Sequence, residues 1–250
     1  MDINRTLRLS AGKFMQDVVP KTQLYLHHTV GGSAISTYNY WEGKTNRVAT
    51  AYIIERDGTI YEVFDPHYWA WHLGLKTASN TIANKQSIGI EIASEGALRS
   101  GAELNNSLAA NGQPDRFENG MLYAFDIDPA RDDTGKLLPA SQWYKHAKRL
   151  YNISTDGAKY VDFPVPLGPF RGYTYFDTYD PKQVISTNWL VNQLCDQFNI
   201  PKVLVTGDRF RFDASLITGF SGVLTHTNVR QDKSDLCPSW DWSLTEAAFQ

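Results

Sequence analysis

The sequence is short of cysteine, with only Cys195 and Cys237 among 250 residues. Two cysteines cannot build the several disulfide bridges on which small secreted scaffolds depend. The fold must therefore rest on a hydrophobic core, and a chain of this length with 42% hydrophobic and 20% charged residues is long enough to bury one. A single bridge between the two cysteines stays open, as does synthesis in a reducing compartment.

Long apolar runs and a strong charge of one sign are also missing. No stretch approaches the roughly 18 apolar residues of a membrane-spanning helix, and the N-terminal segment lacks the basic and then apolar regions of a signal peptide. The net charge of −3 comes without a basic stripe, which argues against a nucleic-acid partner. We therefore expect a protein that is made in the cytoplasm, with no membrane or nucleic-acid partner. We also expect a monomer, although the sequence has no feature that sets the oligomeric state.

Aromatic residues, by contrast, are abundant. The chain has 7 Trp, 13 Tyr and 12 Phe. Such residues suit a groove that holds sugars or peptides, and they suit an aromatic core equally well. The composition alone leaves both interpretations open.

Apolar patterns predict four strand regions. Residues 23–29 alternate large apolar and polar side chains, and 50–64 give two strands around a turn at Arg56, Asp57 and Gly58. Residues 86–94 are apolar almost throughout, which is typical of a central strand. Residues 221–227 are expected to be a last strand or a loop.

Helical spacing predicts two helices, at 34–42 with Gly43 ending the first, and at 181–198. Between them, residues 96–179 are rich in Gly, Pro, Asp, Asn and Tyr and show weak periodicity. We interpret 96–179 as a large insertion beside a binding cleft, within a single domain that covers 1–250.

Histidines and possible metal ligands stand near both ends of the chain. His27 and His28 are neighbours on a predicted strand, so only one of them can face a given site. His226 lies far away in sequence and is followed by Asp235 and Cys237. A lone buried histidine is more often a core residue, but His, His and Asp or Cys is a permissible ligand set for a catalytic Zn²⁺, which needs three protein ligands and one open position.

These residues lie in five motifs that follow one another in a family order. The chain resembles the type 2 N-acetylmuramoyl-L-alanine amidases in LHHT, VATAYIIERDGTIYE, AWHLG, SIGIEI and the terminal motif that begins at His226 and ends in DKSDLCPSWDW. Peptidoglycan recognition proteins and an amidase-type phage lysozyme share their fold. The resemblance covers residues 20–95 and 180–242, and it implies an α/β fold with a mixed central β-sheet, flanking helices and a zinc site on one sheet face.

The resemblance also implies a ligand set. His27 matches the first zinc ligand and His226 the second. KSDLCPSWDW aligns without gaps with the branch that uses an aspartate, which makes Asp235 the third ligand. Another branch uses a cysteine followed by proline, which would select Cys237. The family places a catalytic Lys or Thr two residues before the ligand, and Lys233 fits Asp235.

A second catalytic residue and two candidate substrate contacts follow from the same comparison. Glu91 matches a glutamate beside the metal, and a carboxylate in an apolar strand needs a cation or a function. The phage-lysozyme branch has a tyrosine one strand earlier, where this chain has Thr50. His72 matches a histidine near the cleft and is the candidate substrate contact. Trp71 beside it is a second candidate, although packing is the more ordinary role for its ring.

The implied reaction is zinc-assisted hydrolysis of the amide bond between N-acetylmuramic acid and L-alanine. Bound zinc would polarise the carbonyl group, Glu91 would transfer the proton of water, and Lys233 would stabilise the oxyanion. The expected partner is peptidoglycan or a muropeptide. The prediction favours a phage lysin or another wall-degrading enzyme that reaches the wall after release or in a virion. The alternatives are a cytoplasmic recycling amidase and a recognition protein that binds without cutting.

Overall fold

The computed structural model describes residues 1–98, 106, 116–118, 121–124, 149–152, 159–160, 163–164, 170–173, 175–177 and 179–249. The chain forms two compact units. The first consists of Met1–Ser94, Asp180–Leu236 and Trp242–Gln250, and the second of Glu95–Tyr179 with Cys237–Asp241. The division of the chain into one domain with an insertion stays a prediction.

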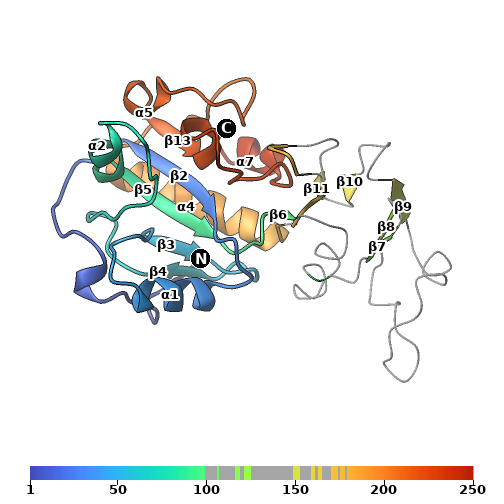
Figure 1. Ribbon diagram of the computed structural model, residues 1–250, viewed down its shortest axis with the longest axis horizontal. Helices are drawn as coiled ribbons and strands as arrows, with labels where there is room; N and C mark the ends of the chain where they lie inside the picture. Colours follow the sequence, from blue (N-terminus) through green and yellow to red (C-terminus); the bar gives the residue numbers. More distant parts are fainter. Residues whose placement is uncertain are drawn as a thin grey trace. The chain divides into compact units, whose positions relative to one another are not determined.

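A six-stranded mixed sheet forms the centre of the first unit. Its order is β1 (Ile3–Asn4), β4 (Ile60–Glu62), β3 (Tyr52–Ile54), β5 (Ser87–Ile92), β2 (Gln23–His28) and β13 (Gly222–Thr225). The β3–β4 pair is antiparallel, as expected for a hairpin, whereas β5, β2 and β13 run parallel. Figure 1 shows β2 and β5 side by side in the middle of the sheet. Both are almost wholly buried, which explains the nearly continuous apolar sequence of β5.

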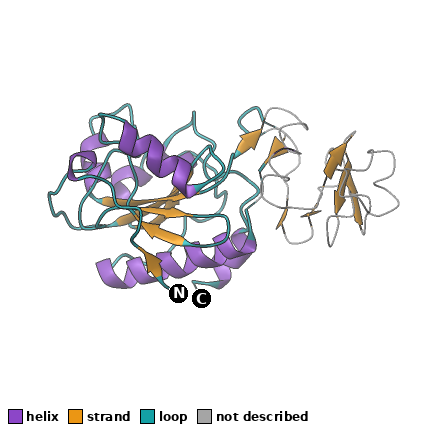
Figure 2. Ribbon diagram, turned by 90° about the horizontal axis from the view of Figure 1, so that it is seen from below, coloured by secondary structure: helices purple, strands orange, loops and turns teal. Residues whose placement is uncertain are grey.

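Helices lie on both faces of this sheet. The helices are α1 (Ala34–Gly43), α2 (Asn80–Lys85), α4 (Pro181–Phe198), α5 (Leu216–Gly219), α6 (His226–Val229) and α7 (Trp242–Ala247), with a 3₁₀ turn at Ala11–Lys13. Figure 2 shows α1 and the long helix α4 on opposite sides. The predicted mixed α/β architecture is therefore confirmed. Among the described residues, none of the helices combines the length and the apolar composition that crossing a bilayer requires.

Helix α4 shows how local sequence sets an element. Asp180 caps its first turn and Pro181 occupies a position where no backbone N–H is needed. Gln183 closes a capping box with Asp180 and also donates from Nε2 to the carbonyl of Ala93 at 2.8 Å. At the other end Asn199 adopts a left-handed conformation with φ of 54°, which ends the helix.

Most of the predicted elements are present. The helix at 181–198 and the hairpin are confirmed, and the helix expected at 34–42 includes Gly43 as its last residue. In the region 221–227 the strand alternative is confirmed by β13, which ends at Thr225, but the helix α6 that follows was not predicted. The two-residue strand β1 and the short helices α2, α5 and α7 were not predicted.

The second unit has short strands. β6 (Ala97–Leu98) pairs with β12 (Tyr175–Phe176), and β10 (Lys159–Tyr160) pairs with β11 (Phe163–Pro164). A three-stranded antiparallel sheet contains β7 (Arg116–Glu118), β8 (Met121–Ala124) and β9 (Arg149–Asn152). Most of the segment predicted as an insertion at 96–179 lies outside the described residues. Both cysteine thiols are free and buried, so the structure has no bridge between them.

The register of β2 and β5 decides which side chains share a face. His27 lies opposite Glu91, and Tyr25 lies opposite Gly89. Directly paired residues of neighbouring strands point to the same side of a sheet, and side chains alternate along a strand. Tyr25, His27, Gly89 and Glu91 therefore share one face, and His28 belongs to the other. The predicted separation of the two neighbouring histidines follows directly from this alternation.

Candidate metal centre and active site

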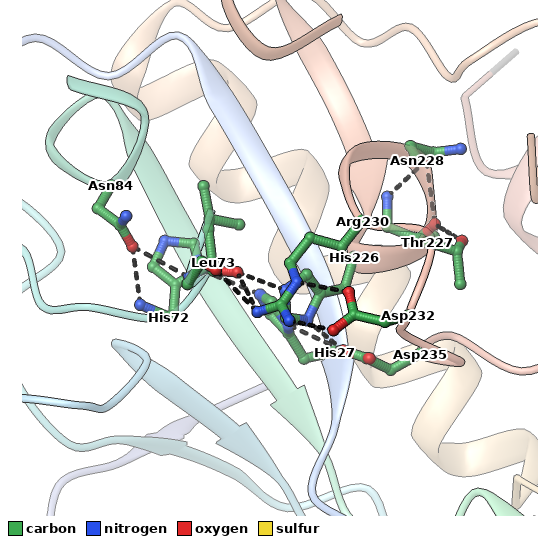
Figure 3. A network of polar contacts seen from close by, with 12 residues as sticks. His27, His72, Leu73, Asn84, His226, Thr227, Asn228, Arg230, Asp232 and Asp235 are labelled. Atoms are coloured by element: carbon green, nitrogen blue, oxygen red, sulfur yellow. Dashed lines mark hydrogen bonds and ion pairs between the residues drawn. The ribbon is translucent and has the colours of Figure 1, made fainter. Parts of the chain in front are cut away.

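Three buried side chains converge at one end of the sheet. His27 comes from β2, His226 is the first residue of α6, and Asp235 lies in the loop that follows α6. The Nδ1 atom of His27 is 3.1 Å from Nδ1 of His226, and each of these nitrogens is 2.9 Å from Oδ2 of Asp235. Figure 3 shows the three side chains turned toward one another. The structure thus brings together the three residues predicted to bind zinc.

The local fold explains this convergence. β2 and β13 are parallel neighbours, so their carboxyl ends meet at the same edge of the sheet. The chain then turns into α6, where Asn228 Oδ1 accepts a hydrogen bond from the backbone N–H of Thr225 at 2.8 Å. The loop returns to α6 through a hydrogen bond from Thr227 N to Asp235 O of 2.9 Å. These contacts fix the side chains of residues 226 and 235 relative to β2.

The three atoms suit a tetrahedral zinc ion. Zinc bonds of about 2.0–2.1 Å to nitrogen and oxygen place tetrahedral ligands about 3.3 Å apart, close to the separations of 2.9–3.1 Å found here. Nε2 of His226 lies 2.8 Å from the carbonyl oxygen of Leu73, which can only accept a hydrogen bond. His226 therefore carries a hydrogen on Nε2, and its Nδ1 has a lone pair for a metal.

The charges of the site match this role. Burial lowers the pKa of His27 to about 4, against the attraction of Asp235. Burial alone would raise the pKa of Asp235, but His226 and His27 outweigh that effect and hold it well below its ordinary value. At neutral pH the group offers a neutral imidazole and an ionised carboxylate, which are the forms that bind a metal ion.

Glu91 lies beside this group, on the strand next to His27. Burial, helped by the negative charge of Asp235, raises the pKa of Glu91 to about 8. Its Oε2 atom is enclosed and has no hydrogen-bond partner within the described part of the chain. Glu91 also lines a cavity of about 360 Å³, whose other walls include Thr29, Val30, Thr37, Tyr40 and Trp41. A buried carboxylate that holds a proton near neutral pH and faces a cavity is suited to acid–base chemistry.

Lys233 is half-buried in the loop between α6 and Asp235. Its positive charge lowers the pKa of Glu91 and also that of His27. Lys233 precedes Asp235 by two residues, and its charge acts on both a candidate metal ligand and the candidate base. The structure therefore gathers the two residues predicted as catalytic around the same centre.

The remaining candidates have partners within the protein. Nδ1 of His72 is 3.0 Å from Nε2 of His27, and Nε2 of His72 is 2.9 Å from Oγ of Ser87. The ring of Trp71 packs edge to face against Trp69, with centroids 5.1 Å apart. Contact of His72 or Trp71 with substrate stays a prediction.

Two alternative positions have other contacts. The Cys237 thiol is 3.4 Å from Oη of Tyr179 and 3.0 Å from Oγ of Ser239, and burial raises its pKa to about 11. The three-residue group contains Asp235 and not Cys237, which agrees with the aspartate branch. Thr50 is buried and its hydroxyl donates to the carbonyl of Tyr52 at 2.9 Å.

The sequence patterns did not indicate the outer partners of the histidines. These are the carbonyl of Leu73, the hydroxyl of Ser87, and the side chains of Asn84 and Arg230, which hold the turn at 72–74. The only available signal was the AWHLG motif itself. A backbone carbonyl has no sequence signature, because nearly every residue can offer one.

Comparisons with known proteins identify a family. Residues 18–239 match the model of the N-acetylmuramoyl-L-alanine amidase family, Amidase_2. One similar solved structure is the N-acetylmuramyl-L-alanine amidase AmiD from E. coli, in complex with the substrate anhydro-N-acetylmuramic acid-L-Ala-D-gamma-Glu-L-Lys. AmiD is 14% identical to this chain, with a TM-score of 0.49, and the match covers 96% of this chain and 60% of AmiD. PlyL is 12% identical, with a TM-score of 0.48, and the match covers 99% of this chain and 97% of PlyL.

A selenomethionine AmpD derivative is 14% identical, with a TM-score of 0.43, and the match covers 96% of this chain and 91% of AmpD. No curated protein matches the sequence. The family match nevertheless extends over most of the chain, from before β2 to beyond Asp235. The predicted amidase motifs and the family match thus agree, and the chain belongs to the N-acetylmuramoyl-L-alanine amidase family.

Proposed function

We propose that the protein is a zinc-dependent enzyme that hydrolyses the amide bond between N-acetylmuramic acid and L-alanine in peptidoglycan. One observation carries this proposal. Nδ1 of His27, Nδ1 of His226 and Oδ2 of Asp235 meet at separations of 2.9–3.1 Å, and Glu91 lies on the strand beside them. A set of three protein ligands leaves a fourth position for water or substrate, as in catalytic zinc sites.

Zinc bound by His27, His226 and Asp235 would supply Lewis-acid activation of the water and of the amide carbonyl. Glu91 is the proton carrier, because its buried carboxylate accepts a proton readily and adjoins the ligand group. In its ionised form, which the positive charge of Lys233 favours and a bound Zn²⁺ would favour further, Glu91 would take the proton of the attacking water and return it to the departing L-alanine amine. Lys233 contributes positive charge where the oxyanion develops.

The cavity next to Glu91 supports the assignment of substrate class. Helix α1 contributes Ser36, Thr37, Tyr40 and Trp41 to its lining, so hydroxyl groups and aromatic rings lie together. Aromatic faces pack against the apolar faces of sugars, and hydroxyl groups form hydrogen bonds with sugar and peptide groups. We propose that this cavity holds the part of the muropeptide next to the scissile bond.

Substitution of Glu91 by Gln tests the reaction. The Gln side chain keeps the shape but cannot carry the proton, so kcat should fall by about 10²–10⁴ while zinc content stays at the wild-type level. The measurement is release of new L-alanine amino termini from purified peptidoglycan, with zinc determined on the same samples. Glu246→Gln is the matched control, because Glu246 is an exposed glutamate paired with Arg209.

Wild-type turnover by Glu91→Gln would remove Glu91 from the mechanism. Wild-type protein that binds zinc and muropeptide without cleavage would be a recognition protein instead. Activity that survives complete removal of zinc by a chelator would contradict the zinc dependence.

The biological setting is a separate part of the proposal. We propose that the enzyme acts on polymeric cell-wall peptidoglycan, as a phage lysin or a wall-degrading enzyme does. The size of the segment 96–179 supports this, since a small soluble product would not need so large an addition. Rates on intact sacculi and on soluble anhydromuropeptides should be compared at equal concentrations of scissile bonds. A higher rate on the soluble substrate would favour a recycling enzyme.

A further inference from the structure

The turn His72–Leu73–Gly74 contacts both histidines of the ligand group, at the ring nitrogens that face away from the metal position. Nδ1 of His72 meets Nε2 of His27, and the carbonyl of Leu73 meets Nε2 of His226. Figure 3 shows this turn beside the ligand group. We propose that the turn positions the metal centre by fixing, for both histidines, which ring nitrogen is free to bind zinc. The inference rests on the proposed zinc site but not on the amidase reaction.

On the His27 side, a chain of hydrogen bonds determines where each hydrogen lies. The hydroxyl of Ser87 donates to the carbonyl of Ala83 at 2.7 Å, so its oxygen accepts from Nε2 of His72 at 2.9 Å. Nδ1 of His72 then has a lone pair and accepts from Nε2–H of His27 at 3.0 Å. This leaves Nδ1 of His27 without a hydrogen and directed at the ligand group.

On the His226 side, the turn acts through its backbone. The carbonyl oxygen of Leu73 lies 2.8 Å from Nε2 of His226 and accepts its hydrogen. The lone pair of Nδ1 is thereby directed at His27 and Asp235. One turn thus orients both rings, the first through a side chain and the second through a carbonyl group.

The turn is itself held from two sides. Oδ1 of Asn84, which is completely buried, accepts from the backbone N–H of His72 at 2.7 Å and from that of Leu73 at 3.1 Å. Nη1 of Arg230 donates to the carbonyl of Gly74 at 2.8 Å, and Arg230 is held by its ion pair with Asp232. Helix α2 and the loop after α6 therefore clamp the same three residues.

Gly74 makes the clamp possible. It adopts φ of +58°, which other residues rarely tolerate, and a Cβ atom there would lie 2.7 Å from Nη1 of Arg230. In this arrangement both ring nitrogens of His72 serve partners within the protein. His72 is a positioning residue for His27, which gives the AWHLG motif a role besides substrate contact.

Zinc affinity measured by competition with a chromogenic chelator tests the inference. His72→Phe keeps a ring but removes the acceptor for His27, and zinc binding should weaken by about 10–100-fold, the usual effect of an outer-sphere partner. His72→Asn restores an acceptor near the position of Nδ1 and should recover most of the affinity. His67→Phe is the matched control, because His67 is half-exposed and contacts Asp65 rather than the ligand group.

A second pair of variants tests the backbone half of the turn. Arg230→Met removes the donor to Gly74 and should also weaken zinc binding. Arg211→Met is its control. Arg211 forms an ion pair with an aspartate two residues further on, Asp213, as Arg230 does with Asp232. Cobalt(II) substituted for zinc should give an altered visible spectrum in His72→Phe, because the ring of His27 is free to change its orientation.

Wild-type zinc affinity and an unchanged cobalt spectrum in His72→Phe would overturn the inference. Absence of zinc from the wild-type protein would overturn both the metal site and this role of the turn. If wild-type protein binds one zinc but cleaves no amide bond, the proposed reaction fails, and loss of affinity in His72→Phe still supports the turn. If His72→Phe does not fold, zinc affinity is measured in His72→Asn and Arg230→Met instead. Wild-type zinc affinity in Arg230→Met would contradict the role of Arg230 in holding the turn.

Discussion

Lys21 places a positive charge inside the protein. Its side chain is 4% exposed, and Nζ donates to the carbonyl oxygens of Tyr68 at 2.9 Å and Lys85 at 2.8 Å. Burial lowers the pKa of Lys21 to about 8, because two carbonyl groups replace only part of the hydration of the ammonium group. Lys21 thus connects the start of β2 to the end of α2 through hydrogen bonds, and its buried charge lowers the free energy of unfolding while the amine is protonated.

This depressed pKa predicts how stability depends on pH. Between pH 8 and 10.5 the unfolded lysine still binds a proton that the folded one has released, so stability rises with pH across this window. The shift corresponds to a gain on the order of 3 kcal/mol. In Lys21→Met this rise should be absent from urea unfolding measured between pH 7.5 and 10.5.

Lys76→Met is the control for that experiment, since Lys76 is exposed. The control should follow the wild-type pH dependence. A rise of equal size in wild type and Lys21→Met would show that Lys21 does not release its proton in the folded protein.

Gly89 in the middle of β5 leaves room for the turn on the sheet face above it. A Cβ atom at this position would lie 2.6 Å from Cγ2 of Thr50 and 3.1 Å from Nδ1 of His72. Gly89→Ala should therefore lower the free energy of unfolding by about 1–3 kcal/mol, as overpacking does. It should also weaken zinc binding, because His72 must move away from His27.

Thermal unfolding and chelator competition on the same protein check both effects. Gly43→Ala is the matched control, because a Cβ atom at the end of α1 has nothing within 4 Å. Loss of stability in Gly89→Ala with unchanged zinc affinity would mean that Thr50 alone absorbs the added methyl group.

The elements that the sequence predicted are those with strong local signals. β2 alternates large apolar and polar residues, β5 is apolar almost throughout, and α4 carries its own cap at Asp180. β1 could not be predicted, because two residues become a strand only through their pairing with β4. Helix α2 has six residues, and Asn84 joins it to the turn at 72–74 through tertiary contacts. Short elements depend on such contacts more than on propensity.

The candidate site divides in the same way. His27, His226, Asp235 and Glu91 lie in sequence motifs, so the amino-acid sequence is enough to propose them. Their partners depend on distances that only the folded chain defines, as for the carbonyl of Leu73. The sequence motif already favoured Asp235 over Cys237, and the folded loop after α6 places Asp235 rather than Cys237 in the three-residue group.

At the scale of the whole molecule, the three candidate metal ligands come from parts of the chain that are far apart in sequence. His27 is near the N-terminus, whereas His226 and Asp235 come after α4. Zinc that binds only the folded protein stabilises it by mass action, by about 2.7 kcal/mol when free zinc is 100 times the dissociation constant. Addition of a chelator should remove this stabilisation and lower the melting temperature.

The pH dependence of that stabilisation follows from the ligands. The pKa of His27 is lowered to about 4 and that of Asp235 lies well below its ordinary value, so both are ready to bind zinc down to about pH 5. Without zinc, unfolded His27 binds more protons than folded His27 between pH 4 and 6.5, so this residue by itself makes the metal-free stability rise with pH there, whereas the raised pKa of Glu91 opposes the rise. Melting temperatures with and without zinc should differ at pH 7 and converge below pH 4.

Asp235→Asn separates the zinc effect from the intrinsic pH dependence. The amide keeps the shape of the side chain but removes the charge that attracts the metal, so zinc should shift the melting temperature of this variant little at any pH. Asp196→Asn is the matched control, since Asp196 pairs with Lys202 at the surface and should leave the zinc shift intact. An equal zinc shift in Asp235→Asn and wild type would place the stabilising ion elsewhere, and with it the proposed connection between β2 and the C-terminal loop would fail.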